Sequence, residues 1–149
     1  MTTFNIAEIS AEETYPLRSL VLRNRDENIP CPFDGDSDLS TKHFGCFHEN
    51  KIIGIASFYL RKNDLLGNRE MVQLRGMATA PDFANRGCGK ALINHAIDYF
   101  RKGNMDLIWC NAREVAFGFY KKLGFVKKGE NFLIPEIGIH IVMYRNLNS

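Results

Sequence analysis

The sequence predicts an α/β (α+β) fold, with a mixed, largely antiparallel central sheet of six to seven strands and helices on both faces. A strand pattern, a glycine-rich loop and a helix pattern follow one another between residues 71 and 102, and a second strand–helix–strand succession comes after them. The composition, with 45% hydrophobic and 24% charged residues in a chain of 149, is that of an ordinary globular protein. Because no linker, repeat or low-complexity tract interrupts the chain, we expect a single domain over residues 1–149.

The N-terminal segment predicts a short strand followed by a helix. Phe4, Ile6 and Ile9 are the apolar residues of the strand. Ser10 and Glu13 have the spacing of a capping box, in which each side chain bonds the backbone N–H of the other residue. The helix that follows is expected to bury one apolar face, which consists of Leu17, Leu20 and Val21.

Residues 25–41 predict a loop, since they contain two prolines and a glycine. Three aspartates alternate with other residues in its second half: Asp34, Asp36 and Asp38. Their spacing is superficially that of a calcium loop, but the positions that require glycine and glutamate are Leu39 and Gly45. We expect the aspartates to be solvated, with recognition of an amine acceptor as the second interpretation.

Three further strands are predicted in the middle of the chain. The first two, residues 42–48 and 52–60, should form a hairpin that turns at Glu49-Asn50. A turn at Gly67-Asn68 leads into the third strand, residues 71–79. This strand should end before Pro81, because proline has no N–H group for a sheet.

The loop after that strand is the most informative segment. Residues 81–92 read P-D-F-A-N-R-G-C-G-K-A-L, in which Gly87 and Gly89 let the backbone approach a ligand closely. The loop runs into a helix, so that free N–H groups and the positive end of the helix dipole meet there, as in phosphate sites. The apolar face of this helix consists of Leu92, Ile93, Ala96, Ile97 and Phe100. The helix is expected to end with Arg101 and Lys102 in its last turn and with Gly103 directly after it.

Three classes of phosphate site compete for this loop. A P-loop requires glycine and a hydroxyl residue where this chain has Ala84 and Ala91, and a dinucleotide fingerprint requires a small residue where it has Leu92. The third class is the coenzyme A loop of the GNAT acetyltransferases, Gln/Arg-x-x-Gly-x-Gly/Ala, which the two glycines resemble. Ala84 occupies the first position of that pattern, and Arg86 is the nearby positive charge.

A second motif decides among these classes. Residues 106–126 predict an apolar strand, Leu107 to Cys110, a helix that ends at Gly124, and a new strand from Phe125. The apolar residues of the helix are Val115, Ala116, Phe119, Tyr120 and Leu123. The stretch A-x-x-x-Y-K-K-L-G-F strongly resembles the second coenzyme A motif of the GNAT family, and so does its distance from the glycine loop.

The resemblance implies the GNAT fold and the direct transfer of an acetyl group from acetyl-CoA to a primary amine of a small molecule or peptide. It makes Tyr120 the general acid, since a phenol has a pKa near that of the leaving thiol. The residues expected to hold coenzyme A are Met77, Ala78, Thr79, Asn85, Arg86, Gly87, Cys88, Gly89, Lys90, Asn111, Arg113 and Tyr120. Arg113 stands where the family often has asparagine, and Asn111 lies near it.

The sequence does not assign the general base that would deprotonate the acceptor amine. The strand before the loop carries Gln73 and Arg75, neither of which is a base, and Glu70 at its start is expected to be solvated. A water relay to His140 is the alternative. This histidine lies in the second of two predicted C-terminal strands, residues 131–134 and 137–145.

Composition bounds the remaining possibilities. A net charge of +2 with both signs mixed indicates no nucleic-acid partner, and no apolar run reaches the ~18 residues of a membrane span. The sequence has no export-signal pattern, so we expect a cytoplasmic protein with reduced cysteines, either a monomer or a homodimer. We expect no metal site, because the four cysteines do not have metal-ligand spacing: Cys31, Cys46, Cys88 and Cys110. The alternatives to acetyl transfer are a non-catalytic acyl-CoA sensor, transfer of a longer acyl group, and nucleotide binding.

Overall fold

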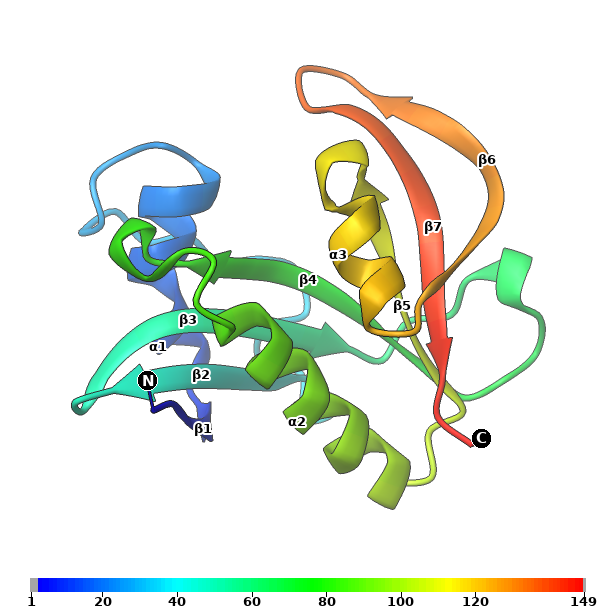
Figure 1. The fold of residues 1–149 in the computed structure, drawn as a ribbon, viewed down its shortest axis with the longest axis horizontal. Coiled ribbons are helices and arrows are strands. Elements are labelled where there is room, and N and C mark those ends of the chain that lie inside the picture. The colour runs from blue at the N-terminus through cyan, green and yellow to red at the C-terminus, as the bar shows by residue number, and fades with distance from the viewer. Residues whose placement is uncertain (1–2, 149) are drawn as a thin grey trace. The chain divides into compact units, whose positions relative to one another are not determined.

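The computed structural model describes residues 3–148 and forms a seven-stranded sheet with the strand order β1-β2-β3-β4-β5-β7-β6 (Figure 1). The strands are β1 (Asn5–Ile9), β2 (Lys42–His48), β3 (Lys51–Tyr59), β4 (Met71–Thr79), β5 (Leu107–Arg113), β6 (Val126–Ile134) and β7 (Gly138–Asn146). The α-helices are α1 (Ala11–Leu17), α2 (Cys88–Lys102) and α3 (Phe117–Lys122). Strands β4 and β5 pair in parallel, whereas β1–β2, β2–β3, β5–β7 and β6–β7 pair antiparallel. The predicted mixed, largely antiparallel sheet is confirmed.

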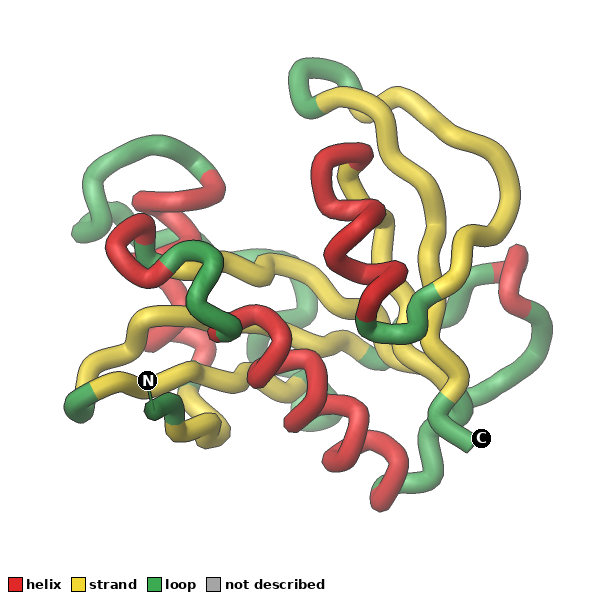
Figure 2. Tube along the Cα trace, viewed as in Figure 1, coloured by secondary structure: helices red, strands yellow, loops and turns green. Residues whose placement is uncertain are grey.

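The chain forms two compact units, each of which draws on separate stretches of sequence. The first consists of Met1–Tyr59 and Leu74–Ala96, and the second of Leu60–Gln73 and Ile97–Ser149. Strand β4 and helix α2 each contribute residues to both units. Figure 2 shows the path of the chain with its helices, strands and loops.

In the first unit, helices cover both faces of the sheet. Ile55 of β3 packs with Leu17 of α1 in one apolar cluster. Its neighbour Gly54 faces the other way, since a Cβ at that position would lie 3.4 Å from Leu92 Cδ1 of α2. Successive residues of a strand point to opposite faces, so α1 and the first part of α2 cover opposite sides, as predicted.

Helix α1 begins with the predicted capping box. The Ser10 hydroxyl accepts a hydrogen bond from the Glu13 N–H at 3.2 Å, and the Glu13 carboxylate accepts one from the Ser10 N–H at 2.9 Å. The expected apolar face is wrong beyond Leu17, however. A π-helical turn, Arg18–Leu22, widens the spiral and turns Arg18 inward, while Leu20 and Val21, 41% and 36% exposed, face solvent.

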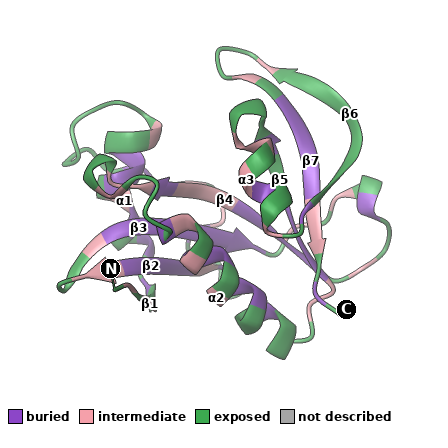
Figure 3. Cartoon of the chain, viewed as in Figure 1, coloured by how far each residue is buried: buried purple, intermediate pink, exposed green. Residues whose placement is uncertain are grey.

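The hairpin and the two following elements agree with the predictions. Glu49 and Asn50 both have positive φ, 50° and 65°, as a two-residue hairpin turn of the I′ type requires. Strand β4 ends at Thr79, and a 3₁₀ turn, Pro81–Phe83, follows it. In α2 the five apolar residues of the predicted face are all buried, which Figure 3 shows as the buried stripe of that helix.

The second unit has its own apolar core and includes the β6–β7 hairpin, in which β6 is largely exposed and the middle of β7, residues 140–143, is buried (Figure 3). Trp109, the one tryptophan of the sequence, is buried in this core, and its indole N–H donates to the Arg61 carbonyl oxygen at 2.9 Å. The core residues are Leu66, Met71, Leu107, Trp109 and Val142. Val115, expected on the apolar face of a helix, is instead 86% exposed, because residues 114–116 form a 3₁₀ turn before α3.

Candidate functional site

The predicted pyrophosphate loop lies open to solvent in the first unit. Asn85 and Gly87 have φ angles of 61° and 92°, in the left-handed region, and a Cβ at Gly87 would meet nothing within 4 Å. Asn85, Arg86, Gly87 and Lys90 are all exposed. The fifteen-residue helix α2 begins at Cys88, so its first N–H groups lie next to this open loop. The loop therefore has the properties of an anion-binding helix N-terminus.

Cys88 is the buried member of the loop, with 2% of its surface exposed. Its sulfur forms a hydrogen bond with Cys46 and another with Thr79. These two hydrogen bonds lower the pKa of the Cys88 thiol below its usual value, although burial by itself would raise that pKa. The hydrogen bond between the two cysteines and burial raise the pKa of Cys46. With both sulfurs enclosed, Cys88 can offer a ligand its backbone N–H but not its thiol.

The strand segment that precedes the loop contains an irregularity at Gly76. This residue has φ +66°, and a Cβ there would lie 2.9 Å from Cε2 of Phe33. Beyond it, Ala78 is buried in the first unit's core, whereas Met77 and Thr79 are half-buried. Glycine is required at position 76 both for the backbone angle and for the close approach of the phenyl ring.

Tyr120 of α3 is buried in the second unit. Its ring lies 5.2 Å from the rings of Phe119 and Phe125, and 8% of the residue is exposed. Burial raises the pKa of its phenol well above 10, and the hydrogen bond with Cys110 raises it further. The hydroxyl is therefore protonated at neutral pH.

The structure does not bring Asn111 and Arg113 to the same face of β5 as the Tyr120 hydroxyl. Cys110 and Ala112 are buried, Asn111 and Arg113 are exposed, and the pairing of β5 with β7 is regular throughout. Because residues alternate between faces, Cys110, which contacts Tyr120, and the two exposed residues point in opposite directions.

His140, the candidate relay residue, is 4% exposed and already has partners. Its Nδ1 atom lies 2.9 Å from the Gly138 carbonyl oxygen, and its ring stacks on Phe132 at a centroid distance of 5.8 Å. Gln73 is also buried, and Glu70 is exposed at the start of β4, where it forms an ion pair with Lys62 at 3.6 Å.

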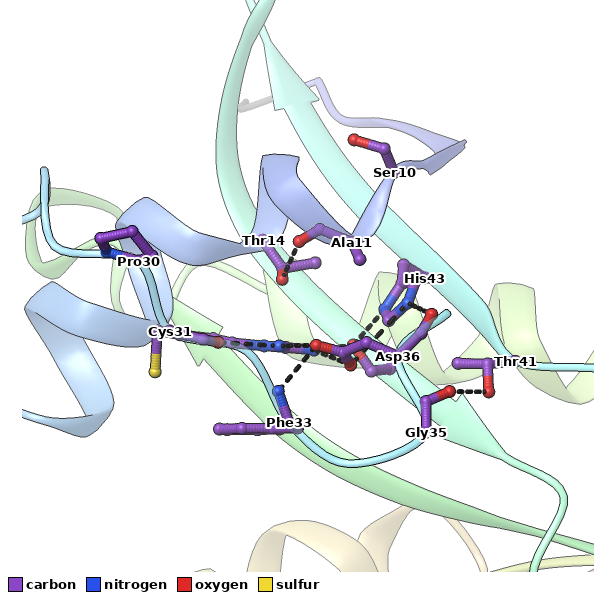
Figure 4. Close-up of polar contacts among 12 residues, drawn as sticks. Ser10, Ala11, Thr14, Pro30, Cys31, Phe33, Gly35, Asp36, Thr41 and His43 are labelled. Carbon is purple, nitrogen blue, oxygen red and sulfur yellow. Dashed lines mark hydrogen bonds and ion pairs between the residues drawn. The ribbon is translucent and has the colours of Figure 1, made fainter. Parts of the chain in front are cut away.

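A buried polar cluster that the sequence did not reveal lies in the first unit (Figure 4). Arg18 has no exposed surface and forms two hydrogen bonds to the Asp36 carboxylate, at 2.7 and 3.1 Å. It also donates to the Ser57 hydroxyl at 2.9 Å and the Tyr59 hydroxyl at 3.2 Å. The expectation that Asp36 is solvated is wrong, although Asp34 and Asp38 are exposed as expected.

The ionisation of this cluster is set by its hydrogen bonds. Burial alone would raise the pKa of Asp36, but hydrogen bonds from Arg18, the Phe33 N–H and Tyr59 outweigh it and lower the pKa to about 2. Burial and the hydrogen bond to Asp36 raise the pKa of Tyr59 to about 12. The cluster is thus an ion pair inside the protein, with a neutral phenol beside it.

His43 and Ser57 complete the cluster without forming a nucleophilic site. The Nδ1 atom of His43 lies 2.7 Å from the Ser57 hydroxyl, and its Nε2 atom lies 3.1 Å from the Asp36 carbonyl oxygen. Ser57 has no exposed surface, so that no substrate reaches its hydroxyl. The signal available in the sequence was the presence of these polar residues in otherwise apolar strands.

Comparisons with known proteins identify the family of the chain. The model of the acetyltransferase (GNAT) family matches residues 5–125. The chain is 38% identical over 144 residues to YitI of Bacillus subtilis strain 168, an uncharacterized N-acetyltransferase, with 97% of both chains covered.

Solved structures with low identity share the fold. The ribosomal-protein-S18-alanine N-acetyltransferase of Escherichia coli superposes with a TM-score of 0.74 at 19% identity, over 99% of this chain and 96% of the other. FeeM, an N-acyl amino acid synthase from uncultured soil microbes, superposes with a TM-score of 0.78 at 13% identity, over 100% and 93%.

Among residues 3–148, no helix is long and apolar enough to cross a membrane, and no three metal-binding side chains converge. The family match covers most of the chain and the curated relative nearly all of it. This protein belongs to the acetyltransferase (GNAT) family and is an acyltransferase.

Proposed function

We propose that the protein transfers an acetyl group from acetyl-CoA directly to a primary amine of a small molecule or peptide. The observation that carries the proposal is the exposed loop Asn85–Lys90 at the start of α2, whose open side and free N–H groups match a pyrophosphate. Arg86 and Lys90 are exposed in the loop and add positive charge. We expect the reaction to use no metal and to take place in the cytoplasm, in a monomer or homodimer.

The acyl end of the cofactor is assigned to the backbone of β4. N–H groups of Met77, Ala78 and Thr79 would bind the pantetheine arm and polarise the thioester carbonyl. Loss of one such donor typically costs on the order of 3 kcal/mol of transition-state stabilisation. Their position directly after the irregular Gly76 supports the assignment, because the φ of +66° interrupts a regular strand there.

Tyr120 is proposed as the general acid that protonates the leaving thiolate. The raised pKa supports this role, since the phenol keeps its proton at the pH of the reaction. For the transfer, the hydroxyl would exchange its Cys110 contact for the sulfur of coenzyme A. The competing role is a core position between Phe119 and Phe125.

The acceptor amine must lose a proton before it attacks. We propose that water carries this proton, since β4 offers Gln73 and Arg75 and no carboxylate in the positions before the loop. His140 as the end of the relay remains the alternative. Asn111 and Arg113 are proposed as cofactor contacts through their exposed side chains, which lie on the face of β5 opposite Cys110 and would therefore hold a part of coenzyme A other than its sulfur.

The decisive experiment separates binding from transfer. Isothermal titration with acetyl-CoA should show binding, and free-thiol release in a panel of amines and peptides should identify an acceptor. No binding at millimolar acetyl-CoA would refute the proposal. Tight binding of acetyl-CoA without thiol release for any amine would indicate an acyl-CoA sensor. Faster thiol release from longer acyl donors would indicate that the protein transfers a longer acyl group. Displacement of acetyl-CoA by ATP would indicate a nucleotide site.

A further inference from the structure

The space above Gly76 of β4 is filled by groups from other segments of the first unit. A Cβ at this position would lie 2.9 Å from Cε2 and 3.6 Å from Cδ2 of Phe33, and 3.5 Å from Nε of Arg18. Phe33 belongs to the loop before β2, and Arg18 to the π-helical turn after α1. One edge of the phenyl ring therefore lies directly against the Gly76 backbone. Phe33 is half-buried, so part of it remains accessible to a ligand.

The buried ion pair of Arg18 and Asp36 holds this ring in place. The Cζ atom of Arg18 lies 4.0 Å from the centroid of the Phe33 ring, and its Nη1 atom donates to the Cys31 carbonyl oxygen at 3.0 Å. The Phe33 N–H donates to the Asp36 carboxylate at 2.8 Å (Figure 4). Both the ring and the backbone of this loop are thus attached to two buried side chains, which makes Phe33 a fixed wall beside β4.

The cofactor assignments proposed above order the ligand along β4. The pyrophosphate is assigned to residues 85–90, which follow the strand, and the thioester to N–H groups of residues 77–79 at its end. The pantetheine arm would therefore run back along the strand, and the acyl group beyond the thioester would come next to Gly76. A strand advances only about 3.3 Å per residue, so each methylene added to the acyl group brings it closer to the Phe33 ring.

We propose that Phe33 limits the size of the acyl group, so that the protein transfers acetyl and rejects butyryl and longer groups. This inference rests on the acetyl transfer proposed above. The methyl of an acetyl group ends before the ring, whereas a longer chain must displace a ring that Arg18 and Asp36 hold. Displacing a packed side chain costs free energy, and this cost falls on the longer donors alone.

The first test compares acyl donors in the thiol-release assay with one acceptor amine from the panel. The donors are acetyl-, propionyl-, butyryl- and hexanoyl-CoA. A pocket discriminates a single methylene by about 10- to 200-fold, so we expect kcat/KM to fall at least about tenfold from acetyl- to butyryl-CoA. Isothermal titration of each donor without acceptor measures binding independently of turnover, and Kd should rise in the same order.

Variants then assign the discrimination to the ring. Phe33→Ala removes the ring, and Phe33→Leu leaves a smaller apolar side chain that preserves more of the packing. The ratio of kcat/KM for acetyl-CoA to that for butyryl-CoA should shrink by at least about tenfold in Phe33→Ala and by less in Phe33→Leu. Phe4→Ala, which removes another half-buried phenylalanine of the first unit, is the matched control and should leave the ratio unchanged. Far-UV circular dichroism checks the folding of each variant, and Phe33→Leu carries the test if Phe33→Ala does not fold.

The outcomes distinguish the two proposals. Equal or faster thiol release from butyryl-CoA in the unmodified protein, or an acetyl preference that survives both Phe33 variants, overturns the role of the ring and leaves acyl transfer standing. No thiol release from any donor with any amine contradicts the transfer itself. In that case titration decides, and equal Kd values of the unmodified protein for acetyl- and butyryl-CoA overturn the size limit as well.

Discussion

The Arg18 guanidinium and the Asp36 carboxylate form a two-point ion pair whose side chains are 0% and 5% exposed. Asp36→Asn should therefore lower the free energy of unfolding by about 3–5 kcal/mol, because it leaves the Arg18 charge buried without a counter-charge. Urea unfolding followed by far-UV circular dichroism measures the loss. Asp38→Asn, in the exposed part of the same loop, is the control and should change stability by less than about 0.5 kcal/mol. A loss of unfolding free energy below about 1 kcal/mol for Asp36→Asn would show that other groups compensate the buried charge of Arg18.

Acid should destabilise the protein through the same carboxylate. The folded pKa of Asp36 is about 2, below its usual 3.8, so its contribution is complete above pH 4 and is lost as the pH falls toward 2. A lowering of this size corresponds to about 2 kcal/mol. Urea midpoints measured from pH 5 to pH 2 should fall less steeply for Asp36→Asn than for the unmodified protein. Parallel curves would assign the acid sensitivity to other carboxylates.

Removal of the Tyr120 hydroxyl should separate catalysis from packing. In Tyr120→Phe we expect kcat to fall about 100-fold or more, the usual contribution of a general acid, with a nearly unchanged KM for acetyl-CoA. The ring remains between Phe119 and Phe125, so stability should fall by only about 1 kcal/mol. Tyr99→Phe, an exposed tyrosine of α2, is the control. Unchanged turnover and an unchanged pH profile would make Tyr120 a core residue.

The conformation of the glycine loop should be needed for cofactor binding. Gly87→Ala places a Cβ on a residue with φ 92°, at a conformational cost of about 1–2 kcal/mol, and should raise Kd for acetyl-CoA by about tenfold. Gly67→Ala is a matched control, since Gly67 has φ 78° and equally open surroundings but lies outside the loop. Titration calorimetry should show a weaker complex for the first variant alone. Equal Kd values would contradict the assignment of the loop.

The start of α2 depends on the absence of a side chain at Gly54. A Cβ there would lie 2.1 Å from the Cys88 sulfur, so Gly54→Ala should cost about 2–3 kcal/mol of stability through overpacking. In a Cys88→Ala background the sulfur is gone, and the added cost of Gly54→Ala should drop below about 1 kcal/mol. Urea unfolding of the four proteins in this cycle measures the coupling. Additive effects would place the strain elsewhere.

Elements with strong local signals could be predicted from the sequence almost to the residue. The strands at residues 42–48 and 71–79 have turn residues or proline at their ends, and those residues set their limits in the structure as well. The capping box at Ser10 and Glu13 is another short-range signal, since both partners lie within one helical turn. Such features depend on neighbours in the chain rather than on the tertiary fold.

The errors arose where distant residues decide the local structure. Arg18 turns inward because Asp36, eighteen positions away, balances its charge, and no pattern around either residue announces the pair. The π-helical turn that exposes Leu20 and Val21 goes with that inward turn. The coenzyme A contacts and the role of Tyr120 come from motif resemblance and stay predictions, since they depend on a ligand.

The position of Trp109 makes the two units separately observable in solution. Its indole is enclosed in the core of the second unit and bonded to the Arg61 carbonyl, so its fluorescence emission should shift to longer wavelength when that core opens. Far-UV circular dichroism, by contrast, averages over the helices and strands of the whole chain. Coincident curves from the two signals would mean that the protein melts as one cooperative body, and separated curves would mean that each half has its own melting point.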